Sequence, residues 1–81
     1  MARSDKLFAA MKTSPRGDWT IADIQSLCRD FGITCKAPTR GSHYTLSHPE
    51  IGGHLTIPAR RPIKPIYIRL LIGMIEGLPR P

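Results

Sequence analysis

The sequence predicts an α+β domain with two N-terminal helices, a three-stranded antiparallel sheet and a C-terminal helix, the helices covering one face of the sheet. Three observations predict it. Before Gly32 the apolar residues recur at helical spacing. Over Ile33–Pro58 they alternate with polar residues, as in half-buried strands. After Pro62 and Pro65 the chain is apolar on most sides, which is typical of a helix packed in a core.

The two N-terminal helices have recognisable boundaries. Ser4 can cap a first helix over Asp5–Lys12, which a stretch containing proline and glycine then ends. The second helix follows Thr20, which with Asp23 resembles a capping box, and it ends at Gly32. One apolar stripe runs along the second helix and consists of Ile21, Ile24, Leu27, Cys28 and Phe31.

Three strands are expected over Ile33–Ala37, Ser42–His48 and His54–Pro58, with a hairpin turn between the last two. For the apolar faces of these two strands to coincide, directly opposed residue numbers must sum to an odd value. A loop of residues 49–52 meets this condition. It pairs Leu46 with Leu55, Tyr44 with Ile57, and Ser47 with His54.

The last helix is expected over Ile66–Gly77, with Gly73 as a close-packing point. This apolar helix could be buried in the core of the domain or against a partner. Because helices cover one face of the sheet, the other face should carry the polar members of the alternation. These residues are Thr34, Lys36, His43, Thr45, Ser47, His54 and Thr56. This polar face is the candidate functional surface.

Charge is the informative part of the composition. The 81 residues form a single domain with a net charge of +6. Between residues 33 and 69 only Glu50 opposes six cations, which are Lys36, Arg40, Arg60, Arg61, Lys64 and Arg69. Such a surface suits a polyanion, because each neutralised phosphate releases counterions. A solvated basic surface, or a docking surface for an acidic protein, fits the same charges.

The chain shows no apolar run long enough to span a bilayer, and its start lacks the apolar core of a secretory signal. We therefore expect a cytoplasmic protein that makes no use of a membrane. Cys28 and Cys35 are then expected to be reduced thiols.

The three histidines have different expected roles. Because side chains alternate between the two faces of a strand, His43 is expected on the polar face. An exposed imidazole can move protons at neutral pH. The nearby Lys36 and Arg40 would favour its neutral form. A solvated surface residue is the alternative. His48 is expected to be a hydrogen-bonded structural residue, and His54 lies on the polar face several residues from His43.

Neither a metal nor a cofactor is expected. The spacing of the histidines and cysteines lacks the paired ligands of a zinc site.

Four motifs occur in order between Trp19 and Leu78: RGSHY, SHPE, HLTIP and RRPIKPIYI. With this order and spacing the chain resembles the HicA toxins, which are small mRNA interferases of toxin–antitoxin pairs. The resemblance implies a fold similar to a double-stranded-RNA-binding domain, with residues 1–18 as an extension helix and loop before a core of residues 19–78. It also implies that His43 is catalytic and that a HicB antitoxin masks the surface. Tyr44 stands where many members have a second histidine.

The first hypothesis is therefore a metal-independent endoribonuclease acting on mRNA. His43 would take the proton of a ribose 2′-hydroxyl, and Lys36 and Arg40 would stabilise the developing phosphorane. Gly41 and Ser42 would let the backbone approach the RNA closely. The RNA strand would be held by three further cations, namely Arg60, Arg61 and Lys64. The alternatives are a basic RNA-binding module without chemistry and an interaction protein that docks on an acidic partner.

Overall fold

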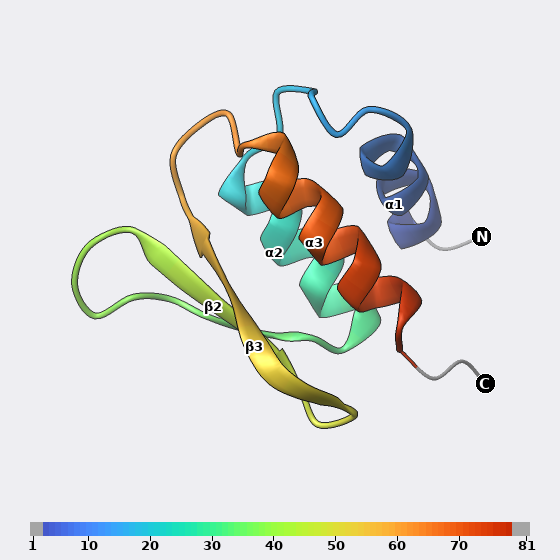
Figure 1. The fold of residues 1–81 in the computed structure, drawn as a ribbon. Coiled ribbons are helices and arrows are strands. Elements are labelled where there is room, and N and C mark those ends of the chain that lie inside the picture. The colour runs from blue at the N-terminus through green and yellow to red at the C-terminus, as the bar shows by residue number, and fades with distance from the viewer. Residues whose placement is uncertain (1–2, 79–81) are drawn as a thin grey trace.

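The computed structural model describes residues 3–78 and confirms the predicted α+β class. The elements follow in the order α1 (Arg3–Thr13), α2 (Ile21–Phe31), β1 (Thr34–Lys36), β2 (His43–His48), β3 (Ile51–Pro58) and α3 (Pro65–Glu76). The strands form one antiparallel sheet with β2 in the centre (Figure 1).

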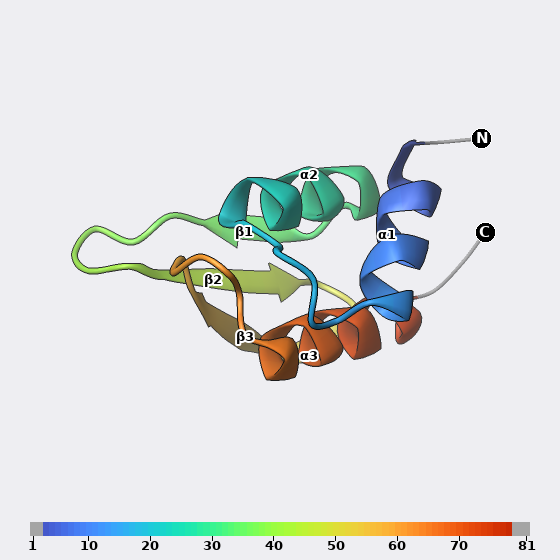
Figure 2. The same cartoon turned by 90° about the horizontal axis from the view of Figure 1, so that it is seen from above.

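Helices α2 and α3 pack on the sheet, as predicted, α2 against β1 and α3 against β3. Helix α1 contacts α2 and α3 and lies on the side of these helices away from the strands (Figure 2). It therefore adds a third layer that the sequence did not predict. The buried core lies between α2, α3 and the sheet, and it includes Ile24, Leu27, Leu46, Ile57, Ile68 and Leu71.

The predicted boundaries of α2 are confirmed. Thr20 Oγ1 accepts a hydrogen bond from the Asp23 backbone N–H, and Asp23 Oδ2 accepts one from the Thr20 backbone N–H. This is a reciprocal capping box. Gly32 ends the helix in the left-handed conformation, at φ 71°. The predicted cap of the first helix is wrong, because α1 begins at Arg3 and Ser4 lies inside it.

The predicted register is confirmed in the middle of the hairpin. Leu46 lies opposite Leu55 and Tyr44 opposite Ile57, while β1 places Cys35 on the other side of Leu46. Parity works here because side chains alternate strictly between the two faces of a regular strand.

Near the turn the predicted register is wrong. His48 lies opposite Ile51, so only Pro49 and Glu50 form the turn, and Ser47 is not paired with His54. The strand pairing is irregular between Leu46 and His48, where β3 has Gly52, Gly53 and His54 against Ser47 alone. Gly53 adopts φ 81°, a conformation that favours glycine, so the glycine pair permits this bulge.

Gly73, expected as a close-packing point, does not pack closely against the described part of this chain. Gly73 is exposed on α3, and a Cβ added there would meet no atom within 4 Å. Over residues 3–78, none of the helices has the length and apolarity that crossing a membrane requires.

Candidate nucleic-acid interface on the open face of the sheet

The polar side chains of the sheet gather on the face that α2 and α3 leave open. Tyr44, Leu46, Leu55 and Ile57 pack into the core from the other face. Directly opposed residues share a face, so Thr45 lies between Lys36 and Thr56, and His43 lies opposite Pro58. Lys36, His43 and Thr56 are exposed to solvent. The division of the strands into an apolar and a polar face is as the sequence predicts.

His43 is the first residue of β2, at the end of the sheet where the loop of residues 37–42 arrives. The Ala59 N–H donates to the Ser42 carbonyl oxygen at 2.7 Å, which extends the contact between the two chain segments beyond the last strand pair. Within residues 3–78 the His43 side chain makes neither a side-chain hydrogen bond nor an ion pair. Its ring nitrogens are therefore free to meet a ligand.

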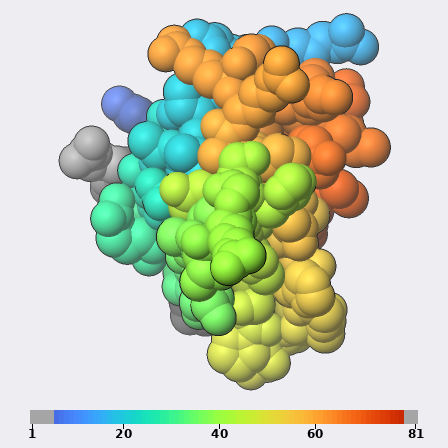
Figure 3. All heavy atoms as spheres, turned by 90° about the vertical axis from the view of Figure 1, so that its left-hand side faces the viewer, coloured from blue at the N-terminus to red at the C-terminus, as the bar shows by residue number. Residues whose placement is uncertain are grey.

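Three cations lie in the segments next to His43. Lys36 lies opposite Thr45 and is therefore the diagonal neighbour of His43 across β1 and β2, a position that separates two residues by about 7–8 Å. Arg40 lies in the loop that leads into β2, and Arg60 follows Ala59 on the segment bonded to Ser42. Figure 3 looks onto this end of the sheet, with the loop (green) facing the viewer and the segment of residues 59–64 (orange) above it, and Figure 2 shows that the loop projects beyond that segment. Lys64 is the N-cap of α3, at the far end of that segment.

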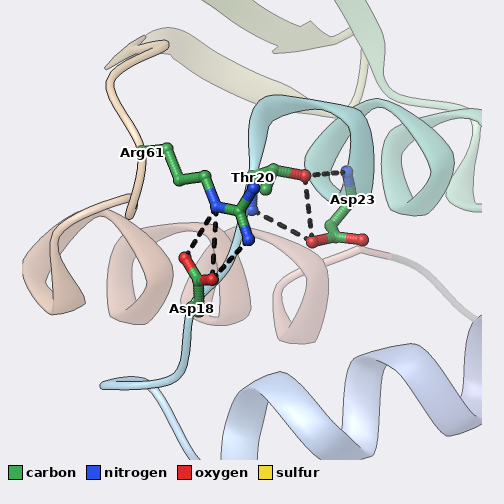
Figure 4. Close-up of polar contacts among 4 residues, drawn as sticks. All are labelled: Asp18, Thr20, Asp23 and Arg61. Atoms are coloured by element: carbon green, nitrogen blue, oxygen red, sulfur yellow. Dashed lines mark hydrogen bonds and ion pairs between the residues drawn. The ribbon is translucent and has the colours of Figure 1, made fainter.

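Arg61 differs from these cations because it has a carboxylate partner. Its Nε donates to Asp18 Oδ1 at 3.0 Å and its Nη2 to Asp18 Oδ2 at 2.5 Å (Figure 4). The Arg61 guanidinium holds the pKa of Asp18 below its usual value, so the carboxylate is charged at neutral pH. The Ile63 N–H also donates to the Trp19 carbonyl oxygen at 2.9 Å. Both contacts tie the basic segment to the loop before α2.

The sequence did not predict the role of Asp18. Asp18 and Arg61 are 43 positions apart, and no spacing rule connects two loop residues at that distance. In the described part of the chain, the ion pairs are Arg61 with Asp18 and Lys12 with Glu76. The remaining predicted RNA-binding cations, namely Lys36, Arg40, Arg60 and Lys64, have no carboxylate partner there.

Gly41 and Ser42 stand where the sequence placed them, in the exposed turn before His43. Gly41 adopts φ 75°, so the backbone conformation by itself favours glycine at this position. A Cβ on Gly41 would meet no atom within 4 Å. The turn is therefore open on its outer side, and a ligand can approach its backbone.

The structural role predicted for His48 is confirmed. His48 is half-buried, and its Nδ1 accepts a hydrogen bond from the Glu50 N–H at 3.0 Å across the turn. His54 is exposed in the bulge of β3 and borders a groove of about 230 Å³ between β3 and α3. The bulge and the length of β3 separate His54 from His43, so the two do not form one site.

No family model, curated protein or solved structure matches this chain. The resemblance to the HicA toxins therefore stays a prediction that depends on the motifs and on the geometry described above.

The thiol side chains lie apart from this face, because Cys28 is in the core and Cys35 packs against it. Within residues 3–78, no three side chains of the His, Cys, Asp and Glu types are placed to hold a metal ion. Both cysteines are free thiols. Burial raises the pKa of Cys28 to about 12, and burial also raises the pKa of Cys35. Both thiols are therefore weak nucleophiles at neutral pH.

A second surface was not predicted from the sequence. Ile66 and Leu70, on the outer side of α3, are 59% and 49% exposed. Leu70 and Met74 also line the groove against Ile51 and Leu55 of β3. Ile66 and Leu70 are one helical turn apart and form a small exposed apolar strip beside this groove.

Proposed function

We propose that this protein is a metal-independent endoribonuclease that cleaves mRNA in the cytoplasm, as the toxin of a HicA-type toxin–antitoxin pair. The observation that supports the proposal best is the position of His43. Its imidazole is exposed on the open face of the sheet, without an internal hydrogen-bond partner and next to segments that carry Lys36, Arg40 and Arg60. A fold of the double-stranded-RNA-binding type is part of the proposal, since helices cover one face of a three-stranded sheet.

In this mechanism His43 acts as the general base. Its neutral imidazole takes the proton of a ribose 2′-hydroxyl, and the oxygen attacks the adjacent phosphorus. The bond from phosphorus to the 5′-oxygen breaks, and the imidazolium returns the proton to that oxygen. The products are a 2′,3′-cyclic phosphate and a 5′-hydroxyl. A positioned base contributes about 10²–10⁴-fold to the rate.

Cations stabilise the charge that develops on the phosphorane. Lys36 and Arg40 are the nearest to His43 along the sheet and along the loop. A preorganised donor of this kind contributes about 3–4 kcal/mol when it is aimed at the developing charge. Arg60 and Lys64 hold the strand on either side, whereas Arg61 is engaged by Asp18 and contributes to the shape of the segment.

The proposed partner is a HicB-type antitoxin. An antitoxin must bind a protein surface, and the strip formed by Ile66 and Leu70 supports such contacts. The net charge of +6 favours a partner with an acidic surface.

One observation favours the second candidate, an RNA-binding module without chemistry. Catalytic bases are usually oriented by a third group, and within residues 3–78 no side chain is hydrogen-bonded to His43. Both candidates require the same basic surface. They differ in whether His43 is needed for cleavage.

The test uses purified protein and a 5′-labelled synthetic RNA in a buffer containing EDTA. We expect the wild-type chain to cut the RNA into products ending in a cyclic phosphate, and His43→Ala to lose cleavage while still binding RNA. His54→Ala is the matched control, because His54 is exposed on β3 but lies away from His43. A substrate with 2′-deoxyribose throughout should stay intact. Undiminished cutting by His43→Ala would refute the mechanism, and binding without any cleavage would support the second candidate.

A further inference from the structure

The aromatic side chains of this protein all pack against the hydrophobic core. The chain has five of them, which are Phe8, Trp19, Phe31, Tyr44 and Tyr67. Each is half-buried and in contact with the core cluster. Phe8 and Phe31 also pack against each other, with ring centroids 5.7 Å apart.

Tyr44 is the informative member because it is next to His43 in the sheet. Its side chain is on the face that packs into the core, opposite Ile57, whereas His43 is on the open face. Proteins that bind single-stranded nucleic acid through its bases stack those bases on exposed aromatic rings. The open face of this sheet carries no Phe, Tyr or Trp ring. Its exposed ring next to Tyr44 is the His43 imidazole, which the proposed mechanism places at the ribose 2′-hydroxyl.

The open face carries small hydroxyl side chains instead. Thr45 and Thr56 lie opposite each other in the row that continues to Lys36, and Thr34 lies opposite Ser47 in the next row. A hydroxyl donates a hydrogen bond to a phosphate oxygen and accepts one from a ribose 2′-hydroxyl. Both groups belong to the RNA backbone and are the same at every nucleotide.

We infer that the open face recognises the ribose–phosphate backbone of RNA and not its bases, so that the enzyme acts on unpaired RNA of any base composition. This inference rests on the proposed function and names its substrate class. Unpaired RNA is required because attack by the 2′-oxygen needs that oxygen in line with the leaving 5′-oxygen. A flexible linkage reaches this arrangement, whereas a regular A-form duplex holds its linkages away from it.

The decisive probe is an RNA strand whose central nucleotides are abasic riboses that keep their 2′-hydroxyl groups. Binding is measured by fluorescence anisotropy with the His43→Ala variant, which removes cleavage from the measurement. We expect the abasic strand, oligouridylate, oligoadenylate and oligocytidylate of equal length to bind within about threefold of one another at one salt concentration, since each presents the same phosphates. A surface that stacked bases would lose about fivefold or more for each base removed.

Matched variants test which side chains are responsible. Thr45→Val and Thr56→Val remove a hydroxyl at nearly constant volume, and each should weaken binding of all four strands by the same factor. Tyr44→Phe removes a hydroxyl from the core-facing side and should leave all four affinities unchanged.

The outcomes separate the inference from the proposed function. A loss of affinity for the abasic strand, with the homopolymers still bound, would overturn the inference and leave the nuclease proposal intact. Failure of every RNA strand to bind would overturn both. With the wild-type enzyme and a mixed-sequence RNA that contains a hairpin, we expect cuts at all unpaired positions and none in the stem. Cuts confined to one base type would count against the inference alone.

Discussion

The contrast between Arg60 and Arg61 gives a sharp prediction, because these adjacent residues differ in one structural feature. Arg61 donates to both carboxylate oxygens of Asp18, whereas Arg60 has no carboxylate partner in the described part of the chain. A cation held by a protein carboxylate releases few additional counterions when RNA binds. We therefore expect Arg60→Gln to change the salt dependence of RNA binding and Arg61→Gln to leave it unchanged.

The magnitude follows from the cations without a partner. If Lys36, Arg40, Arg60 and Lys64 each neutralise one phosphate of a single strand, log K should fall against log salt with a slope of about −3. Arg60→Gln should make the slope shallower by about 0.7. Asp18→Asn should free Arg61 and make the slope steeper by about 0.7, while leaving the number of cations unchanged.

The assay is fluorescence anisotropy with a labelled RNA at several salt concentrations near pH 7, in the His43→Ala background. The pKa of Asp18 lies below its usual value, so the carboxylate is ionised there and the pair with Arg61 is intact. The ion pair stabilises the folded protein above the usual pKa of an aspartate, and this stabilisation is lost as the pH falls through the lowered pKa of Asp18. Urea unfolding of each variant checks that the fold is retained. If Arg61→Gln flattened the slope as much as Arg60→Gln does, the ion pair with Asp18 would not govern the availability of Arg61.

Three further predictions concern stability and reactivity. Thr20→Val removes the hydroxyl oxygen that accepts a hydrogen bond from the Asp23 N–H, and it should lower the free energy of unfolding by about 1 kcal/mol in urea denaturation. An unchanged midpoint would contradict this role of Thr20. Gly73→Ala places a methyl group where no atom lies within 4 Å and should raise the free energy of unfolding by about 1 kcal/mol, whereas a fall would reveal a contact that needs the glycine. Cys28 is buried and its pKa is raised to about 12, so at pH 8 it should react with a disulfide reagent only after denaturant is added, and Cys35 should react first. Equal reaction rates of the two thiols in the folded protein would contradict the burial of Cys28.

The sequence predicted which residues form the candidate site, but it predicted only in part how these residues are arranged. Parity placed His43 on the open face and Tyr44 on the apolar face, and the strand pairings agree with both positions. The same alternation predicted the hydroxyl residues of that face. The availability of each cation was not predicted, since it depends on which carboxylate the folded loops bring near. Asp18 forms an ion pair with Arg61, whereas Arg60 has no carboxylate partner in the described part of the chain.

The features that the sequence by itself determined are those that depend on neighbouring residues. The capping box of Thr20 and Asp23, the left-handed Gly32 and the pairing of Leu46 with Leu55 follow from backbone geometry and from the two-residue repeat of a strand. These constraints act over a few residues, so they can be read before the chain is folded.

The tertiary structure alone decided where segments distant in the sequence meet. Helix α1 packs against α2 and α3, and Gly53 lies in a bulge of β3. Gly73 and Leu70 of α3 are exposed to solvent. Each of these positions depends on which helices and loops pack against the buried core. Because the core has room for only some of the apolar surface, the outcome depends on the whole chain. Local patterns describe which face of an element is apolar, but only packing decides how much of that face is covered.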